Sequence, residues 1–316
     1  MSTITLIISP YHTGLHAHRV GKGPHHILSH NLLAQLTSLG LNIETYEIPR
    51  VDDFEGEIGR SFEVMRRTSL AVSEAVEKGN WPLVLSGNCM ASVAVACGLE
   101  HAQAQGQKKE GQGKLGFIYF DSHDDLDSPD VNENGYFDAM GLSMLRGESW
   151  KLLMNTVPGY DPESPFDYRS NKNRFLYVGL RDQSELQRER VVEAGMYSIW
   201  GGNLNPRTDF GAELEKILEK DPFGDVVVHL DLDVLDAGVY GKVNDYPSEG
   251  GLLEVDLVRS LEVVGKMVSL PKALVVCQFD PDSGDGDLIA GIAIKGIMTL
   301  LKTLLERGVL KSKTSA

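Results

Sequence analysis

Short apolar runs alternate with segments of helical spacing along most of the chain. Strands are predicted at residues 4–9, 41–48, 82–85, 115–120, 175–179, 226–230 and 274–279, most of which are short apolar runs. Helices are predicted by the 3.6-residue spacing at residues 25–39, 60–78, 91–99, 185–194 and 288–307. Alternation of this kind is typical of an α/β fold, in which helices cover both faces of a mainly parallel sheet.

The run at residues 226–236, VVVHLDLDVLD, ends in paired carboxylates. Its unbroken apolar lead-in predicts a strand that is buried on both faces. Side chains two positions apart on a strand point to the same side, so Asp231 and Asp233 should enter one pocket. Two adjacent buried carboxylates are unfavourable unless a cation neutralises them. The pattern therefore predicts a cation site.

A second acidic cluster, DSHDD at residues 121–125, directly follows the strand at 115–120. In parallel sheets the site lies beyond the carboxyl ends of the strands, so Asp121, His123 and Asp125 should share one cavity with Asp231 and Asp233. Four carboxylates and one imidazole suit two divalent cations about 3.5–4 Å apart, with Asp121 and Asp231 as bridging ligands. The alternative is that the acidic residues are only solvated loop ends.

Composition narrows the classes of partner. The chain has 316 residues, of which 42% are hydrophobic and 24% charged, as in ordinary globular proteins. A net charge of −15 argues against a nucleic-acid partner, and no run approaches the roughly 18 apolar residues of a membrane span. Three cysteines without a CxxC pair, and no signal-peptide pattern, predict a cytoplasmic protein. Residues 102–114 are polar and low in complexity, which predicts a surface insertion.

Three motifs carry a resemblance to a known family. DSHDD at 121–125 is similar to Asp-Ala-His-x-Asp, HLDLDVLD at 229–236 to Ser-x-Asp-x-Asp-x-x-Asp, and VGLRD at 178–182 to Ile-Gly-x-Arg. These are motifs of the ureohydrolases, which include arginase, agmatinase and formiminoglutamase, and the resemblance covers nearly the whole chain. It implies one α/β domain over residues 1–316 with an eight-stranded parallel sheet. It also implies a binuclear manganese centre that makes a hydroxide to attack a guanidinium-type carbon.

The first departure from the family pattern lies at a metal position. SGNC at residues 86–89 stands where the family has Gly-Gly-Asp-His, so Cys89 replaces a histidine ligand. A thiolate shifts the preference from Mn²⁺ toward Zn²⁺, Fe²⁺ or Co²⁺, although a buried cysteine can also be a small apolar filler. The resemblance thus implies two divalent ions, with Mn²⁺ as the first choice, on the ligands Cys89, Asp121, His123, Asp125, Asp231 and Asp233.

Further departures fall on catalytic and substrate positions. GYFDAM at residues 135–140 resembles Gly-x-x-His-Gly, so Asp138 takes the place of a proton-shuttling histidine. We expect Asp138 to protonate the leaving nitrogen, with Asp125 as the other catalytic residue; the alternative is that Asp138 caps a helix over 140–145. Gln278 stands where the family has a glutamate that grips the guanidinium, and Ser184 also replaces an acidic residue. An amide carries no charge, which argues against plain arginine or agmatine.

The resulting hypothesis is a hydrolase of non-peptide C–N bonds that acts on a small guanidino, amidino or amide molecule. In the resemblance, the polar end of the substrate meets the loop at residues 127–134, including Asp127, Asn132 and Asn134. Relatives form trimers or hexamers, so a homo-oligomer is expected. Two alternatives remain: a metalloenzyme of specialised metabolism that does not hydrolyse its substrate, or a ureohydrolase-like binding protein whose site has degenerated.

Overall fold

Eight strands form one sheet, and every ladder within it is parallel in the computed structural model, which describes residues 1–52, 56–105, 115–168 and 174–313. From one edge to the other the strands are β4 (Asn42–Glu47), β1 (Thr3–Ser9), β5 (Trp81–Ser86), β10 (Leu270–Cys277), β9 (Asp225–Asp231), β6 (Gly116–Phe120), β7 (Phe175–Leu180) and β8 (Tyr197–Trp200). The predicted α/β class and eight-stranded, mainly parallel sheet are confirmed. A small antiparallel pair, β2 (Tyr11–His12) and β3 (Leu15–His16), follows β1.

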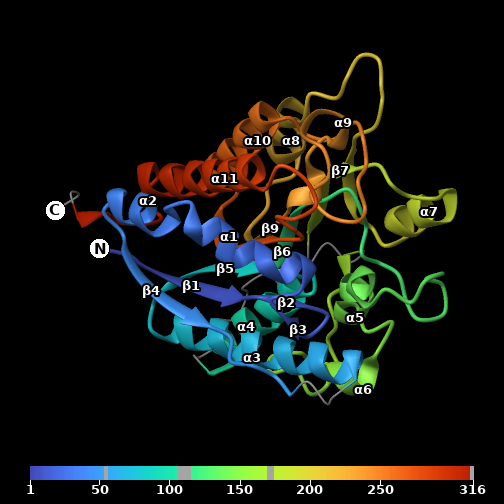
Figure 1. The fold of residues 1–316 in the computed structure, drawn as a ribbon, viewed down its shortest axis with the longest axis horizontal. Coiled ribbons are helices and arrows are strands. Elements are labelled where there is room, and N and C mark those ends of the chain that lie inside the picture. The colour runs from blue at the N-terminus through green and yellow to red at the C-terminus, as the bar shows by residue number, and fades with distance from the viewer. Residues whose placement is uncertain (53–55, 106–114, 169–173, 314–316) are drawn as a thin grey trace.

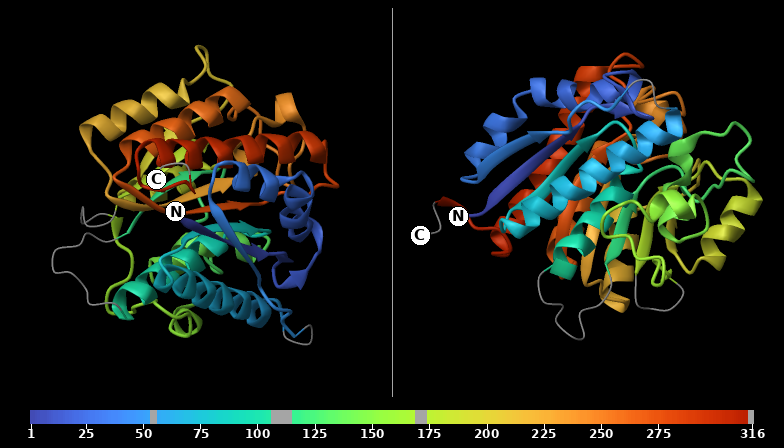
Figure 2. Two further views of the ribbon diagram at one scale, coloured as in Figure 1. Left: turned by 90° about the vertical axis from the view of Figure 1, so that its left-hand side faces the viewer. Right: turned by 90° about the horizontal axis from the view of Figure 1, so that it is seen from below.

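Helices cover both faces of this sheet (Figures 1 and 2). One face carries α1 (Gly23–Ser29), α2 (Leu32–Ser38), α8 (Phe210–Lys220), α10 (Glu254–Met267) and α11 (Gly286–Glu306). The other face carries α3 (Glu57–Glu77), α4 (Ala91–Gln105), α5 (Gly141–Leu145), α6 (Lys151–Met154) and α7 (Glu185–Glu193). Short turns complete the chain: η1 (Arg19–Lys22), η2 (Phe137–Met140), η4 (Leu232–Val234) and α9 (Ala237–Tyr240).

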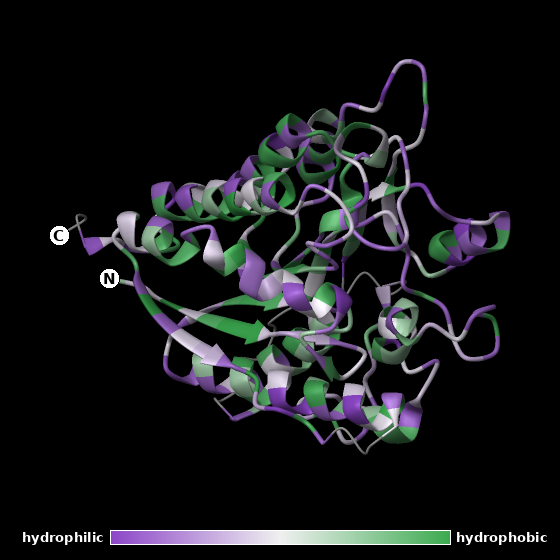
Figure 3. Ribbon diagram, in the orientation of Figure 1, coloured by the Kyte–Doolittle hydropathy of each residue, from purple (hydrophilic) through white to green (hydrophobic). Residues whose placement is uncertain are grey.

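Two hydrophobic cores lie on opposite faces of the sheet, and each strand contributes to both because its successive side chains point to opposite faces. In β1, Ile4 and Leu6 pack into the core under α11, whereas Ile7 packs into the core under α3. Strands that are buried on both faces must be apolar throughout, and β1 is accordingly largely hydrophobic in Figure 3, whereas the exposed edge strand β4 is largely hydrophilic. Helices alternate apolar and polar stripes there because only one side of each meets the sheet.

The closing helix α11 corrects one expectation. By length and composition alone it could cross a membrane, although the sequence analysis found no run of that kind. Within its most apolar window, 67% of the residues are buried inside the structure. A helix that packs between a sheet and its neighbours is apolar over most of its surface for that reason.

Other differences from the predicted elements have local causes. The helix predicted at 25–39 is two helices, α1 and α2, because Asn31 between them has a left-handed backbone with φ of 62°. Strand β8 and the helices α8 and α10 were not predicted. Of the predicted surface insertion at 102–114, residues 102–105 end α4, and residues 106–114 lie outside the described part.

The four central strands bring the predicted site together. β5, β10, β9 and β6 are neighbours, so their carboxyl ends lie at one edge of the sheet. Cys89 follows β5 after two residues, Cys277 ends β10, Asp231 ends β9, and Asp121 directly follows β6. Cys277 and Asp231 are register partners in adjacent strands. Segments far apart in the sequence thus meet because of strand order.

Candidate metal centre

A cavity of about 170 Å³ lies at the carboxyl ends of these strands. Its walls are Cys89, His123, Asp124, Asp125, Asp127, Asn132, Asn134, Tyr136, Asp138, Ala139, Asp182, Gln187, Asp231, Asp233, Tyr246 and Gln278. Of the predicted site residues, only Asp121 and Ser184 are not part of this lining. A concave site with convergent polar groups and room for a small ligand is typical of an enzyme cavity.

Asp121 lies beneath the cavity and is fully buried. Its Oδ1 accepts a hydrogen bond of 2.7 Å from the backbone N–H of His123. Its Oδ2 is buried and accepts no hydrogen bond from any residue that the structure describes; its cationic neighbour is His229 Nε2 at 3.5 Å. A buried carboxylate oxygen in this state is unfavourable, and a metal ion would satisfy it.

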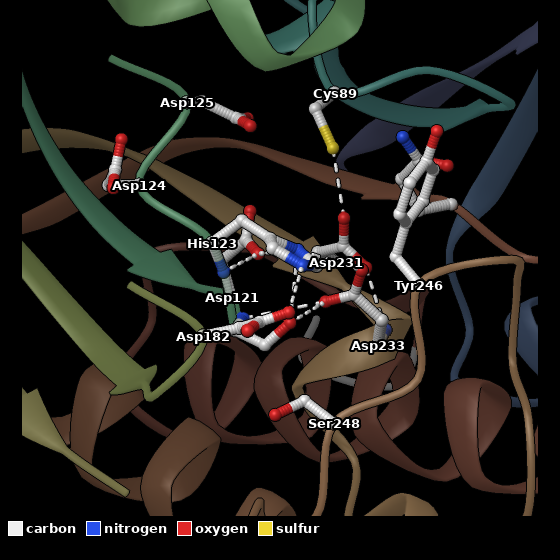
Figure 4. A network of polar contacts seen from close by, with 12 residues as sticks. Cys89, Asp121, His123, Asp124, Asp125, Asp182, Asp231, Asp233, Tyr246 and Ser248 are labelled. Carbon is white, nitrogen blue, oxygen red and sulfur yellow. Dashed lines mark hydrogen bonds and ion pairs between the residues drawn. The ribbon is translucent and has the colours of Figure 1, made fainter. Parts of the chain in front are cut away.

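One set of possible ligands surrounds His123 (Figure 4). Its Nδ1 lies 3.2 Å from Asp233 Oδ2 and 3.6 Å from Asp121 Oδ1, and these three residues can offer ligand atoms within 4.8 Å of one another. Asp233 is oriented by Ser122, whose hydroxyl donates a 2.8 Å hydrogen bond, and by the side-chain amide of Asn244 at 3.0 Å. One imidazole and two carboxylates form an oxygen-rich set that suits a hard divalent ion.

A second set lies deeper, around Cys89. Cys89, Asp121 and Asp125 can also offer ligand atoms within 4.8 Å of one another. The thiol donates a 2.9 Å hydrogen bond to Asp231 Oδ2, and the hydroxyl of Tyr119 donates a 2.7 Å hydrogen bond to Asp125 Oδ2. Cys89 therefore faces the predicted ligands directly, and Asp121 belongs to both sets.

The protonation of these carboxylates follows from burial. Burial raises the pKa of Asp125 and of Asp231 well above their usual range, and the nearby carboxylate of Asp121 adds to the effect. Burial acts in the same direction on Asp233, but the neighbouring His123 outweighs it and lowers the pKa of Asp233. The site thus contains more carboxyl groups than can be ionised together without a cation. The residues present fit two divalent cations, which would supply the missing positive charge.

Asp138 is held at the opposite wall by four hydrogen bonds. Its carboxylate accepts from the backbone N–H groups of Cys89 at 2.9 Å and Met90 at 3.0 Å. It also accepts from the side-chain amides of Asn88 at 2.7 Å and Gln278 at 2.5 Å. The alternative that Asp138 caps the helix over 140–145 is wrong, because its carboxylate binds the turn before α4 instead. Burial raises the pKa of Asp138 to about 6, against the opposing effect of these hydrogen bonds.

Two residues of the site have a backbone conformation that non-glycine residues rarely adopt. The φ angles of Asp125 and Gln278 are 52° and 58°. Left-handed conformations of this kind are unfavourable and occur often at functional sites, where the surrounding structure fixes them. For Gln278 the result is that its amide reaches Asp138, while its Oε1 accepts no hydrogen bond within the described part of the chain.

Comparison with known proteins decides the family. Residues 2–285 match the model of the arginase family. The chain belongs to the arginase family. It is 24% identical to the arginase of Bacillus subtilis over 78% of this chain and 79% of that protein, and 24% identical to N(omega)-hydroxy-L-arginine amidinohydrolase of Streptomyces lavendulae over 67% and 66%. The fold of the Bacillus subtilis arginase crystal structure superposes with a TM-score of 0.76 at 22% identity, over 95% of this chain and 98% of that one. The predicted family is confirmed.

The predicted substrate-binding residues of this arginase-family chain have different surroundings. Ser184 lies outside the cavity lining because it is the N-cap of α7, where it forms a capping box with Gln187. Gln187 itself lines the cavity. Asp127 lines it too, but its carboxylate already accepts from Asn132 at 2.7 Å and lies 3.3 Å from Arg190. Asn132 and Asn134, which were predicted to bind the substrate, line the cavity. The side-chain oxygens of both residues accept a hydrogen bond from the backbone N–H of Tyr136.

Several residues of the site had not been predicted. Tyr136 and Tyr246 form an aromatic wall, with ring centroids 5.2 Å apart. His229 and Cys277 lie just below the predicted metal ligands, although the sequence predicts them only as parts of apolar strands. A histidine and a cysteine within otherwise apolar runs were the signal in the sequence that could have pointed to these two positions. Burial would lower the pKa of His229, but Cys277 and Asp121 raise it to about 10.

Proposed function

We propose that this arginase-family protein is a binuclear metal-dependent hydrolase that cleaves a C–N bond of a small guanidino, amidino or amide molecule. The observation that carries the proposal is the convergence of two acidic motifs on Asp121, whose buried Oδ2 has no hydrogen-bond donor among the described residues. Membership of the family and the hydrolase names of its relatives support the same reaction class.

The metal ligands would form two sets that share Asp121 and Asp231. Cys89, Asp121, Asp125 and Asp231 would hold one ion, and Asp121, His123, Asp231 and Asp233 the other. Two divalent ions bound here would lower the pKa of a shared water molecule and so supply a hydroxide near pH 7. The oxygen-rich set suits Mn²⁺, whereas the thiol of Cys89 also admits Zn²⁺, Fe²⁺ or Co²⁺ in the other set.

The chain's own residues then position the substrate and move a proton. The side-chain amide nitrogen of Gln278 donates to Asp138, which fixes the orientation of the amide. Its oxygen, Oε1, can then accept a hydrogen bond from an N–H group of the substrate. Asp138 lines the same cavity and has a pKa raised to about 6, so its protonated form can give a proton to the departing nitrogen. Asp125 is kept in place by the hydroxyl of Tyr119, which limits its motion during turnover.

The substrate class follows mainly from Gln278. A neutral carbonyl oxygen holds a cationic guanidinium less strongly than a carboxylate does, since charge-assisted hydrogen bonds are about twice as strong as neutral ones. We therefore favour a substrate group that is less basic than the side chain of arginine: a modified guanidine, an amidine or an amide. The aromatic wall of Tyr136 and Tyr246 supplies apolar contact area for the rest of a small molecule.

The proposal extends to the setting of the enzyme. The free thiols of Cys89, Cys97 and Cys277 fit a reducing compartment such as the cytoplasm. Residues 1–316 are proposed to act as one domain within a homo-oligomer, on a small-molecule substrate and without a nucleic-acid or membrane partner.

The test is to replace Asp231 by Asn and to measure metal content and turnover together. We expect the Asp231→Asn protein to retain well under one ion per chain and to have no detectable turnover. Asp236→Asn is the matched control: Asp236 belongs to the same motif but accepts hydrogen bonds from the N–H groups of Gly238 and Gly250, which an Asn oxygen can also accept. Full metal content and activity in Asp231→Asn would overturn the proposal.

A further inference from the structure

The N-terminal part of the chain is rich in histidine. Six of the nine histidines lie between residues 12 and 30, and none of these six lines the cavity described above. Two of them, His26 and His30, belong to the last turn and the C-cap of α1, which packs beside α11 (Figure 1). Residues four apart on a helix lie on the same face, so the two imidazoles can approach one partner together.

That partner is Asp287 in the first turn of α11. Nε2 of His26 and Nε2 of His30 each lie 3.1 Å from Oδ1 of Asp287, in hydrogen-bond geometry. A ring nitrogen that points at an acceptor with its N–H can bind a cation along the same line when the proton is absent. The two rings are 4.9 Å apart between centroids, and Phe279 packs edge-on against His26 at 5.7 Å. The same nitrogen of each ring therefore points at one place.

The spacing of these atoms is close to that of ligands around a zinc ion. Zn–N and Zn–O bonds of about 2.0–2.1 Å at tetrahedral angles place the ligand atoms about 3.3–3.4 Å apart. The observed separations of 3.1 Å are slightly shorter, and the side chain of Asp287 is 79% exposed, so it can move outward to admit the ion. Two histidines, one carboxylate and a water molecule are a known ligand set of zinc in proteins.

The charge around this cluster favours a cation. The segment at residues 280–287 contains four aspartates. Asp282 pairs with Lys22, and Asp285 caps the start of α11, whereas the carboxylate of Asp287 is directed at the two imidazoles. An acidic segment raises the local concentration of cations, and imidazole then supplies the ligands that a transition metal prefers over calcium or magnesium.

We propose that His26, His30 and Asp287 bind a Zn²⁺ ion at the surface, separate from the binuclear centre. The bound ion links α1 to the start of α11 and so holds the segment that runs from the cavity residue Gln278 to Asp287. Because the ion needs both elements in place, it binds the folded chain and stabilises it. The site goes beyond the proposed function and does not depend on it.

The number of zinc ions bound per chain tests the site. The full-length protein is dialysed at a free Zn²⁺ concentration that just saturates it, beside His26→Gln and His30→Gln. A glutamine amide can still donate a hydrogen bond to Asp287, but it does not replace imidazole as a zinc ligand. We expect each variant to bind one ion fewer than the unaltered protein.

His25→Gln is the matched control. His25 lies on the same helix and is 3.0 Å from Glu47, but it belongs to no ligand cluster in the described ranges. This variant should bind as many ions as the unaltered protein. Zinc should also raise its Tm as much as that of the unaltered protein, and raise the Tm of His26→Gln and His30→Gln by less.

Each comparison is a difference between variants, so it holds whether the binuclear centre binds two ions or none. Equal zinc content in the unaltered protein, His26→Gln and His30→Gln would overturn the surface site and leave the proposed hydrolase standing. Loss of an ion in His25→Gln as well would also overturn it, because the binding would then not depend on this cluster. Loss of one ion in His26→Gln and His30→Gln alone would support the surface site even in a protein without turnover.

Discussion

The side-chain amide of Gln278 donates a 2.5 Å hydrogen bond to the carboxylate of Asp138. In the ureohydrolase pattern a glutamate and a histidine stand at these two positions, so the acidic group has changed place within the pair. Asp138 now carries the charge and is buried against the turn before α4, whereas Gln278 presents a neutral oxygen. The pair links the choice of substrate to the proton donor.

Replacing Gln278 by Glu should shift the preference toward cationic substrates. A carboxylate in this position would bind a guanidinium through charge-assisted hydrogen bonds, which exceed neutral ones by about 1–1.5 kcal/mol, or roughly tenfold. We expect the ratio of kcat/KM for a guanidine to that for a neutral amidine to rise by about that factor. The ratio is measured with a panel of guanidine, N-hydroxyguanidine, formimino and amide compounds.

Gln187→Glu is the matched control for this experiment, because Gln187 lines the same cavity and a glutamate fits the third position of its capping box. It adds the same charge on a different wall and should leave the ratio unchanged. An unaltered ratio in Gln278→Glu, or an equal rise in both variants, would show that Gln278 does not set the substrate class.

Replacing Asp138 by Asn should remove the proton donor and leave its hydrogen-bond acceptor in place. General acid–base groups contribute about 10²–10⁴ in rate, so kcat should fall by that factor. Burial raises the pKa of Asp138 to about 6, and only the protonated form donates. The kcat of the unaltered enzyme should therefore decline as pH rises above about 6, and this limb should be absent in Asp138→Asn.

Asp124→Asn is the control for the Asp138 experiment, because Asp124 lines the same cavity and burial also raises its pKa to about 6. The pH limb should persist in this variant. Loss of the limb in Asp124→Asn, or its persistence in Asp138→Asn, would assign the proton transfer elsewhere.

Removal of metal should destabilise the protein more at pH 8 than at pH 5.5. Burial raises the pKa values of Asp125 and Asp231, so the metal-free folded state binds more protons than the unfolded chain, and its stability falls as pH rises. The raised pKa of His123 acts in the same direction, against the effect of burial, because of the nearby carboxylate of Asp233. The lowered pKa of Asp233 matters only below about pH 4.

The measurement is the shift in Tm on adding a chelator at the two pH values. A bound ion offsets the charge of the carboxylates, so the metal-loaded protein should lack the loss of stability at high pH. An equal shift at both pH values, or a larger one at pH 5.5, would contradict the placement of ions among these carboxylates.

Arg181→Lys should reduce the free energy of unfolding by about 2–4 kcal/mol, since it removes several hydrogen bonds of a largely buried charge. Nη2 of the guanidinium lies 2.8, 3.0 and 3.0 Å from the carbonyl oxygens of Asp233, Leu235 and Ser248, which share its two hydrogens, and so holds the loop after β9. Nη1 donates a 2.9 Å hydrogen bond to the carbonyl oxygen of Gly179. A lysine ammonium cannot reproduce this fork.

Urea unfolding monitored by circular dichroism measures the Arg181→Lys effect. Arg259→Lys is the control: its pair with Asp209 is exposed, and the change should stay within about 0.5 kcal/mol. An effect of similar size in both variants would mean that Arg181 does not stabilise the loop.

Much of the architecture could be predicted because it depends on local pattern. Each of the seven predicted strands is present. Six of them are largely buried and therefore largely apolar, whereas β4 is an exposed edge strand. The short strand β8 was missed because its four residues, YSIW, include an exposed Tyr197 and resemble no continuous apolar run. The break between α1 and α2 depends on one left-handed residue, Asn31, within a helical pattern.

The candidate site was predictable only in part. Asp121 and Asp231 each follow an apolar strand, so strand ends alone placed them together. His229 and Cys277 are parts of apolar runs, and only the neighbouring positions of β9 and β10 in the sheet bring them to Cys89. The four hydrogen bonds of Asp138 likewise depend on contacts between segments far apart in the chain. The capping box of Ser184 and Gln187 is local, and the spacing of these two residues was a signal for it in the sequence.

Two cations are proposed to lie between Asp121 and Asp231 in a working centre. The most direct measurement is anomalous X-ray diffraction from crystals of the metal-loaded protein, collected at the absorption edges of manganese and zinc. We expect two peaks about 3.5–4 Å apart, each within coordination distance of Asp121 or Asp231. A map without anomalous density between these two carboxylates, from protein shown to contain metal, would contradict it.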